Sequence, residues 1–174
     1  AYALQDANTG NLRSAASWLS FASARSVEDM REGMRNLGVP WVNTIAADRH
    51  GKAMYADVSV VPDVDAARLT ACTPSPAAAA LLRGAGLVVL DGSRAACDWH
   101  RDAASPVPGL IPIERMPVAM RTDWVQNSND SFVHTHPAQR FTGISPLVGD
   151  ATVNRPRTRA SHTEIPMLLA RGKV

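Results

Sequence analysis

The sequence predicts an α+β fold in which a helix leads into antiparallel strands. Three observations indicate this: apolar residues recur at helical spacing over residues 26–37, strand-forming residues flank a glycine turn over residues 41–60, and a further strand near residue 120 leads into a polar turn. At 174 residues the chain is long enough for one domain with its own core. Two adjacent strands so early in the chain favour a mixed sheet fed by the helix.

The helix over residues 26–37 has a recognisable beginning and end. Ser26 is a typical N-cap, and two acidic residues in the first turn favour the helix dipole. Four apolar residues then recur at helical spacing up to Gly38, namely Val27, Met30, Met34 and Leu37. We interpret the methionines as core packing and expect a helix that ends before Gly38.

A β-hairpin is expected over residues 41–60. The stretch WVNTIAAD precedes a short turn with Gly51, and KAMYADVSVV follows it. β-Branched and aromatic residues on both sides of a glycine turn are typical of two antiparallel strands.

The following residues alternate between loop and short elements. Residues 62–80 predict a loop and then a short alanine-rich helix, and residues 87–90 predict a short strand. Gly84-Ala85-Gly86 lacks the third glycine of a dinucleotide fingerprint, so we interpret it as a turn.

Residues 92–117 contain four prolines and little periodicity. Five apolar residues make this segment unlike a flexible linker, namely Trp99, Leu110, Ile111, Ile113 and Met116. The segment therefore predicts an ordered excursion that packs over a larger body.

The last third of the chain predicts one strand and one helix. Residues 120–137, MRTDWVQNSNDSFVHTHP, indicate a strand that leads into a polar turn. Residues 153–174 are expected to contain the beginning of a helix, within which the given sequence stops.

The composition argues against several classes of partner. A formal net charge of +2 arises from 18 basic and 16 acidic residues without a basic run, which argues against nucleic acids and membranes as partners. The most apolar stretch, residues 77–90, is too short to cross a bilayer. The first ten residues show no signal peptide. The close histidine pair, His134 and His136, has no cysteine or carboxylate at zinc-motif spacing, so we expect neither a metal nor a cofactor.

Two polar stretches are candidates for chemistry. The sequence has no GxSxG motif, whereas VQNSNDS at residues 125–131 and RPRTR at residues 155–159 place amides beside guanidinium groups. A fixed asparagine amide can donate to an oxyanion, and a nearby arginine can hold that donor in place. An Asx-rich turn with a solvated arginine cluster explains the same residues without any function.

Several long stretches together resemble the β-chain of N-terminal-nucleophile amidases of the penicillin acylase family, with its acyl-homoserine-lactone and aculeacin A acylases. They are WVNTIAADRHGKAMYADVSVVPDV, LDGSRAACDW, RTDWVQNSNDSF and TGISPLVG, followed by RPRTR. The similarity extends from about Leu19 to Arg159, and its motifs follow the family's order.

The resemblance implies a four-layer αββα sandwich and hydrolysis of a linear amide, with release of an acyl chain from an amine such as an acyl-homoserine lactone or a lipopeptide. Alignment through NSND implies that Asn129 is the oxyanion-hole asparagine and that Arg157 is its supporting arginine. Trp18 and Trp41 correspond to aromatic residues that line the acyl pocket, although core packing explains them equally well.

The family's nucleophile is an N-terminal serine released by autocatalytic cleavage, whereas this sequence begins with Ala1. We therefore expect residues 1–174 to be part of a longer β-chain, with the nucleophile segment upstream, further residues downstream and an α-chain as partner. The run Val133–Pro137 also departs from the family's aromatic-Leu-Thr-Asn-Pro pattern. A structural or binding fragment without activity of its own is the alternative.

Cys72 and Cys97 are compatible with two buried thiols on sequence grounds alone. Family members are typically exported, so the resemblance implies a Cys72–Cys97 disulfide and a periplasmic or secreted location.

Overall fold

The protein is built around a three-stranded antiparallel sheet of short strands, β1 (Thr44–Ala47), β2 (Ala53–Ala56) and β3 (Val118–Arg121). The computed structural model describes residues 2–149 and 153–172. The predicted hairpin is confirmed as β1 and β2, joined by a turn in which Gly51 has φ +80°. Both strand pairs are antiparallel, so the expected mixed sheet is wrong for the described residues.

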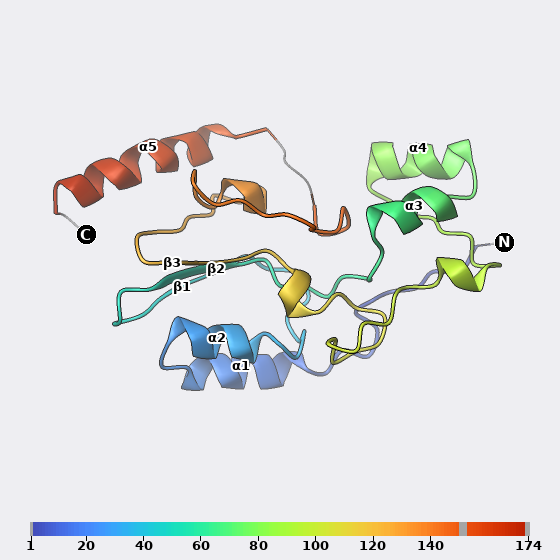
Figure 1. Ribbon diagram of the computed structural model, residues 1–174, viewed down its shortest axis with the longest axis horizontal. Coiled ribbons are helices and arrows are strands. Elements are labelled where there is room, and N and C mark those ends of the chain that lie inside the picture. The colour runs from blue at the N-terminus through green and yellow to red at the C-terminus, as the bar shows by residue number, and fades with distance from the viewer. Residues whose placement is uncertain (1, 150–152, 173–174) are drawn as a thin grey trace.

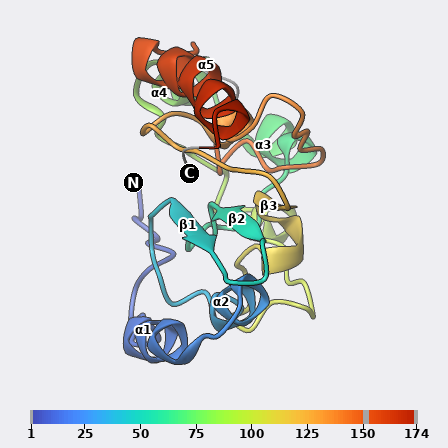
Figure 2. The same ribbon diagram turned by 90° about the vertical axis from the view of Figure 1, so that its left-hand side faces the viewer.

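Two helices, α1 (Ser14–Ser23) and α2 (Val27–Gly33), cover one face of the sheet (Figures 1 and 2). The predicted start of α2 is confirmed, because the Ser26 hydroxyl accepts a hydrogen bond from the Asp29 backbone N–H at 3.1 Å. Its predicted end is wrong: α2 stops at Gly33, and residues 34–36 form a turn before the left-handed Leu37. α1 was not predicted. Its buried residue is Ser17, whose hydroxyl lies 2.6 Å from the Asn36 side-chain oxygen, so α1 packs through a small polar side chain and lacks a clear apolar stripe.

The chain passes close to α1 directly after α2. A Cβ at Gly38 would lie 2.3 Å from the Ser17 hydroxyl and 2.5 Å from the Arg13 carbonyl oxygen, so only glycine fits there. Leu37 takes a left-handed conformation, with φ 51°, while its side chain is 1% exposed in the core. Burial of Leu37 thus offsets the strain of this bend.

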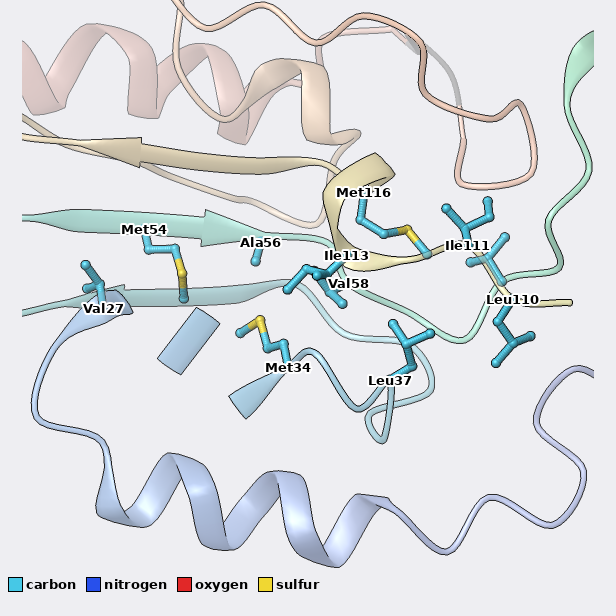
Figure 3. Packing of buried hydrophobic residues seen from close by; sticks show 11 residues of the cluster. Val27, Met34, Leu37, Met54, Ala56, Val58, Leu110, Ile111, Ile113 and Met116 are labelled. Atoms are coloured by element: carbon cyan, nitrogen blue, oxygen red, sulfur yellow. The ribbon is translucent and has the colours of Figure 1, made fainter. Parts of the chain in front are cut away.

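The main core lies between α2, the sheet and the segment before β3 (Figure 3). Its buried apolar residues are Val27, Met34, Leu37, Met54, Ala56, Val58, Val61, Leu110, Ile111, Ile113 and Met116. Four of the five apolar residues expected to hold the 92–117 excursion are buried in it, and Trp99 packs against it partly buried. The ordered excursion is therefore confirmed.

A buried ion pair fixes this excursion to the chain before α3. The Asp63 carboxylate is fully buried, and both terminal nitrogens of Arg115 donate to it, at 2.7 and 2.9 Å. The backbone N–H of Asp63 donates to the Gly109 carbonyl, and the backbone N–H of His100 donates to the Asp63 carbonyl, each at 2.8 Å.

Residues 62–90 form two helices, α3 (Ala66–Cys72) and α4 (Pro76–Ala85). The predicted alanine-rich helix is α4, and it extends through Ala85 to a left-handed Gly86, so the expected turn is the end of this helix. The strand expected at residues 87–90 is wrong. These residues follow Gly86 as an irregular segment that pairs with no strand among the described residues, and Leu87 is 56% exposed.

Cys72, at the end of α3, forms a disulfide with Cys97 in the 3-10 helix η1 (Ala95–Cys97), in agreement with the pairing that the resemblance implies. Both cysteines are buried, at 3% exposure. The bond closes a loop that contains α4, and a loop of this length stabilises the folded state by about 3 kcal/mol.

We expect non-reducing peptide mapping of the complete protein to recover Cys72 and Cys97 in one linked pair, and reductant to lower the melting temperature because the loop then regains entropy when it unfolds. Two thiols that react with iodoacetamide in the native, unreduced protein would contradict the pairing.

The opposite face of the sheet is covered by residues 124–148 and by helix α5 (Pro156–Ala170) (Figures 1 and 2). The helix predicted in the tail is thus confirmed. Tyr55 and Ala119 project from this face of the sheet and pack with Phe132, which belongs to the 3-10 helix η3 (Phe132–His134). None of the helices in residues 2–149 and 153–172 combines the length and the apolar character needed to span a membrane.

Candidate active site

The polar turn, residues 125–131, has a shape fixed by its own side chains. The Asn127 side-chain oxygen accepts a hydrogen bond from the Asn129 backbone N–H at 2.8 Å, and its amide nitrogen donates to the Asp130 carbonyl at 2.9 Å. Asn129 can therefore adopt a left-handed conformation, φ 59°, which asparagine tolerates better than most residues. Asn127 stabilises the turn, and Asn129 is held at its exposed tip.

Further bonds join the two ends of the segment that carries the polar turn. The Gln126 backbone N–H donates to the Thr135 carbonyl, and the Thr135 hydroxyl donates to the Gln126 carbonyl, each at 3.0 Å. Both residues are buried. The buried backbone groups at the two ends and the Thr135 hydroxyl are thus satisfied within the fold, so the stretch is an ordered segment and not a flexible linker.

Asp130 joins the polar turn to the first turn of α5. Its carboxylate accepts hydrogen bonds from the Arg155 backbone N–H at 3.0 Å and from the Thr158 hydroxyl at 2.9 Å. Arg155 itself supplies no side-chain cap, so Asp130 caps the helix from another part of the chain. The Arg155 backbone N–H, together with the Thr158 hydroxyl, holds the pKa of Asp130 below its usual value.

Two more contacts lie on the same face of α5, about one turn further on. The Ser161 and Ser128 hydroxyl oxygens are 3.2 Å apart, and the His162 Nε2 lies 2.7 Å from the His134 carbonyl oxygen. Residues at these spacings face the same side of a helix. α5 is therefore attached to the polar turn by a row of polar contacts.

This attachment brings Arg157 to Asn129. The Nη1 and Nη2 atoms of Arg157 donate to the Asn129 side-chain oxygen at 3.3 and 3.2 Å. Because the guanidinium occupies the oxygen end of the amide, the nitrogen end is left to donate, and no acceptor for it is present among the described residues. A cation on the oxygen also polarises the amide and strengthens the N–H groups as donors. The pair can therefore stabilise an oxyanion.

The residues beside the polar turn form a second polar network. His136 is 7% exposed, with Nε2 3.3 Å from the Asp123 carboxylate and Nδ1 accepting from the Ala138 backbone N–H. Burial, together with the positive charge of Arg121, lowers the pKa of His136. The Trp124 ring lies 4.3 Å from the His136 ring. His136, in the run that departs from the family pattern, is thus held by contacts with residues on both sides of the polar turn.

Trp18 and Trp41 lie on the surface, 59% and 72% exposed, so neither is a core residue in the described structure. Trp18 makes an edge-to-face contact with Phe21, with ring centroids 5.5 Å apart. A cavity of about 680 Å³ lies between the α1–α2 connection and β1, and neither tryptophan lines it. Their role in an acyl pocket stays a prediction, as do the catalytic roles of Asn129 and Arg157.

Three residues that shape the site were missed from the sequence: Asp130, Thr158 and His162. One signal for Asp130 was present, because Arg155-Pro156 begins a helix at proline without a capping residue of its own. Within the described residues, no group of three or more histidine, cysteine or acidic side chains is arranged to hold a metal ion.

An α+β fold in which an arginine fixes an asparagine amide at an exposed turn is compatible with an amidase of the N-terminal-nucleophile type. The chain matches the penicillin amidase family over residues 1–172 and belongs to that family.

Known relatives agree with this assignment. The acyl-homoserine lactone acylase PvdQ of Pseudomonas syringae pv. syringae is 39% identical over 176 residues, which cover the whole chain and 22% of the relative. PvdQ of Pseudomonas putida is 44% identical over 149 residues, 85% of this chain and 18% of the relative. Aculeacin-A acylase of Actinoplanes utahensis is 40% identical over 172 residues, 98% of this chain and 22% of the relative. The chain thus spans about a fifth of the length of these relatives.

Proposed function

We propose that this chain is part of the β-chain of an amidohydrolase with the four-layer αββα fold, in which it supplies one donor of the oxyanion hole. The observation that supports this proposal best is the Asn129 amide, whose oxygen is held by Arg157 and whose nitrogen is directed to donate. In this proposal the three-stranded sheet and the helices α1 and α2 would form two of the four layers.

The proposed reaction is hydrolysis of an amide between an acyl chain and an amine. An N-terminal serine outside this chain attacks the carbonyl carbon, and its own α-amine takes the proton. Negative charge then develops on the carbonyl oxygen, to which the Asn129 N–H donates. The amine leaves with a proton, and water releases the acyl group from the serine.

The names of the relatives suggest the substrate class. Acyl-homoserine lactones and the lipopeptide aculeacin A both carry an acyl chain on an amide nitrogen, so one of these two classes is the proposed substrate. Trp18 and Trp41, both exposed, are proposed to contact the acyl chain when the remainder of the protein is in place. An α-chain of the same precursor is the proposed partner, and the Cys72–Cys97 disulfide supports a periplasmic or secreted location.

We expect the complete, processed protein to release free amine from N-acyl-homoserine lactones of graded chain length or from a lipopeptide, as measured by amine-reactive fluorescence. Residues 1–174 alone should give no release above a boiled control, because the proposed nucleophile is absent. Failure of the complete protein on every acyl amide would contradict the proposal and favour a non-catalytic fragment. Turnover by residues 1–174 alone would contradict the proposed location of the nucleophile.

A further inference from the structure

Asp130 is the buried acidic residue that joins the polar turn to the first turn of α5. Its side chain is 1% exposed, and Thr158, to which it is bonded, is fully buried. Asn129 and Arg157, the proposed functional pair, are by contrast both exposed. The buried Asp130–Thr158 contact thus lies beneath the exposed Asn129–Arg157 pair, which is the part that would meet a substrate.

We propose that Asp130 is a positioning residue for amide hydrolysis: its buried carboxylate fixes the first turn of α5 and thereby holds the Arg157 guanidinium on the Asn129 side-chain oxygen. This inference rests on the proposed function. Asp130 does not touch the reacting atoms and acts through Arg157.

The first argument is the position of Arg157 in the helix. Arg157 immediately precedes Thr158 and lies two residues after Arg155, and both of these neighbours donate to the Asp130 carboxylate. The backbone that carries Arg157 is therefore bracketed by two bonds to one buried group. A shift of this first turn would move the guanidinium relative to Asn129.

The second argument is that the Asn129 backbone has a support of its own. Asp130 follows Asn129 in the chain, and its carbonyl oxygen accepts from the Asn127 side chain. Because this bond goes to the backbone carbonyl, Asp130→Asn retains it, and the main effect of losing the carboxylate falls on the helix turn that carries Arg157.

The third argument is the weakness of the contact that needs support. The two bonds from Arg157 to Asn129, at 3.2 and 3.3 Å, are long and solvent-exposed. Exposed bonds of this kind do little to order a flexible arginine side chain by themselves. The geometry of the pair must then be set by the backbone beneath it, which Asp130 holds.

Asp130→Asn in the complete enzyme is the first test, because asparagine keeps the shape and one acceptor oxygen but removes the charge that binds the helix N-terminus. We expect kcat to fall by about tenfold while KM changes by less than about twofold, because the oxyanion forms only after the substrate is bound. Glu164→Gln, an equivalent change at an exposed residue of the same helix, is the control and should leave kcat unaltered.

A double-mutant cycle separates positioning from a general structural role. If Asp130 acts through Arg157, Asp130→Asn should cause no further loss of kcat in an Arg157→Ala background. A purely structural role would give independent losses that multiply. Multiplying losses, or a wild-type kcat for Asp130→Asn, would overturn the proposal.

Thr158 provides a second variant pair in case Asp130→Asn folds poorly. Thr158→Val removes the hydroxyl that donates to Asp130 and keeps the shape, whereas Thr158→Ser keeps the hydroxyl. We expect Thr158→Val to lower kcat and Thr158→Ser to retain it, with the same lack of further effect in the Arg157→Ala background. Equal kcat values for the two Thr158 variants would contradict the proposal.

Hydrogen–deuterium exchange of the complete protein distinguishes failure of this inference from failure of the proposed function. Asp130→Asn should speed exchange in residues 126–131 and 155–160, and Glu164→Gln should not. If the wild-type protein hydrolyses no acyl amide, the proposed function fails and exchange alone decides whether Asp130 holds the pair. Unchanged exchange in both segments would overturn the inference whether or not the enzyme is active.

Discussion

Asn129→Ala is expected to lower the turnover of the complete, processed enzyme by roughly two to three orders of magnitude. In the proposed reaction the attack on the amide carbonyl concentrates charge on one oxygen, and we expect the Asn129 N–H to stabilise that charge more than it stabilises the ground state. Alanine removes few packing contacts at this exposed tip, but it tolerates the left-handed conformation less well than asparagine, at a cost of about 1 kcal/mol. Steady-state kinetics should show a fall in kcat with a nearly constant KM, and the melting temperature should fall by only a few degrees.

Asn127→Ala is the matched control for this experiment. Asn127 bonds to the backbone of Asn129 and Asp130, so its loss should loosen the polar turn and lower stability more than it lowers turnover. If Asn127→Ala abolished turnover while Asn129→Ala stayed near wild type, the assignment within the polar turn would be wrong by two residues.

Arg115→Ala is expected to have the largest effect on stability, about 3 kcal/mol. The change leaves the buried Asp63 carboxylate without the two bonds that Arg115 donates, at 2.7 and 2.9 Å. We place the loss at the lower end of the usual range because Arg115 is itself 37% exposed. A thermal melt of the complete protein should show a clear drop in the midpoint, and limited proteolysis should show new cleavage within residues 98–116.

Arg101→Ala is the control for the ion pair, because Arg101 belongs to the same excursion and is exposed. It should leave both the melt and the cleavage pattern unaltered. An unchanged melting temperature for Arg115→Ala would show that water replaces its bonds to Asp63, and it would contradict the account of how the excursion is held.

Elements with strong local signals could be predicted from the sequence. Ser26 and the apolar spacing after it defined α2, Gly51 defined the hairpin, and buried apolar residues defined the excursion before β3. α1 was missed because it packs through Ser17 and lacks an apolar stripe. The strand expected at residues 87–90 was wrong because apolar content cannot reveal whether a neighbouring strand exists.

Asn129 and Arg157 could be predicted from the sequence, whereas the residues that hold them in place could not. Resemblance to a family placed Asn129 and Arg157 in two separate motifs, and the structure brings their side chains together. The bonds from Thr158 to Asp130 and from His162 to the His134 carbonyl depend on how α5 lies across this segment. Contacts between residues 28 positions apart have no local signal, so single-sequence reasoning could not find them.

The most direct test of the central claim compares a tetrahedral analogue with a planar ligand. An alkylboronic acid that adds to the proposed serine places an oxygen where the oxyanion forms, whereas an N,N′-dialkylurea, which is planar and resists nucleophilic attack, reports ground-state binding. The account predicts that Asn129→Ala weakens inhibition by the boronic acid by roughly 100-fold or more and leaves binding of the urea within about twofold. Equal boronic acid inhibition of the wild-type and Asn129→Ala enzymes would contradict the claim that this chain supplies an oxyanion donor.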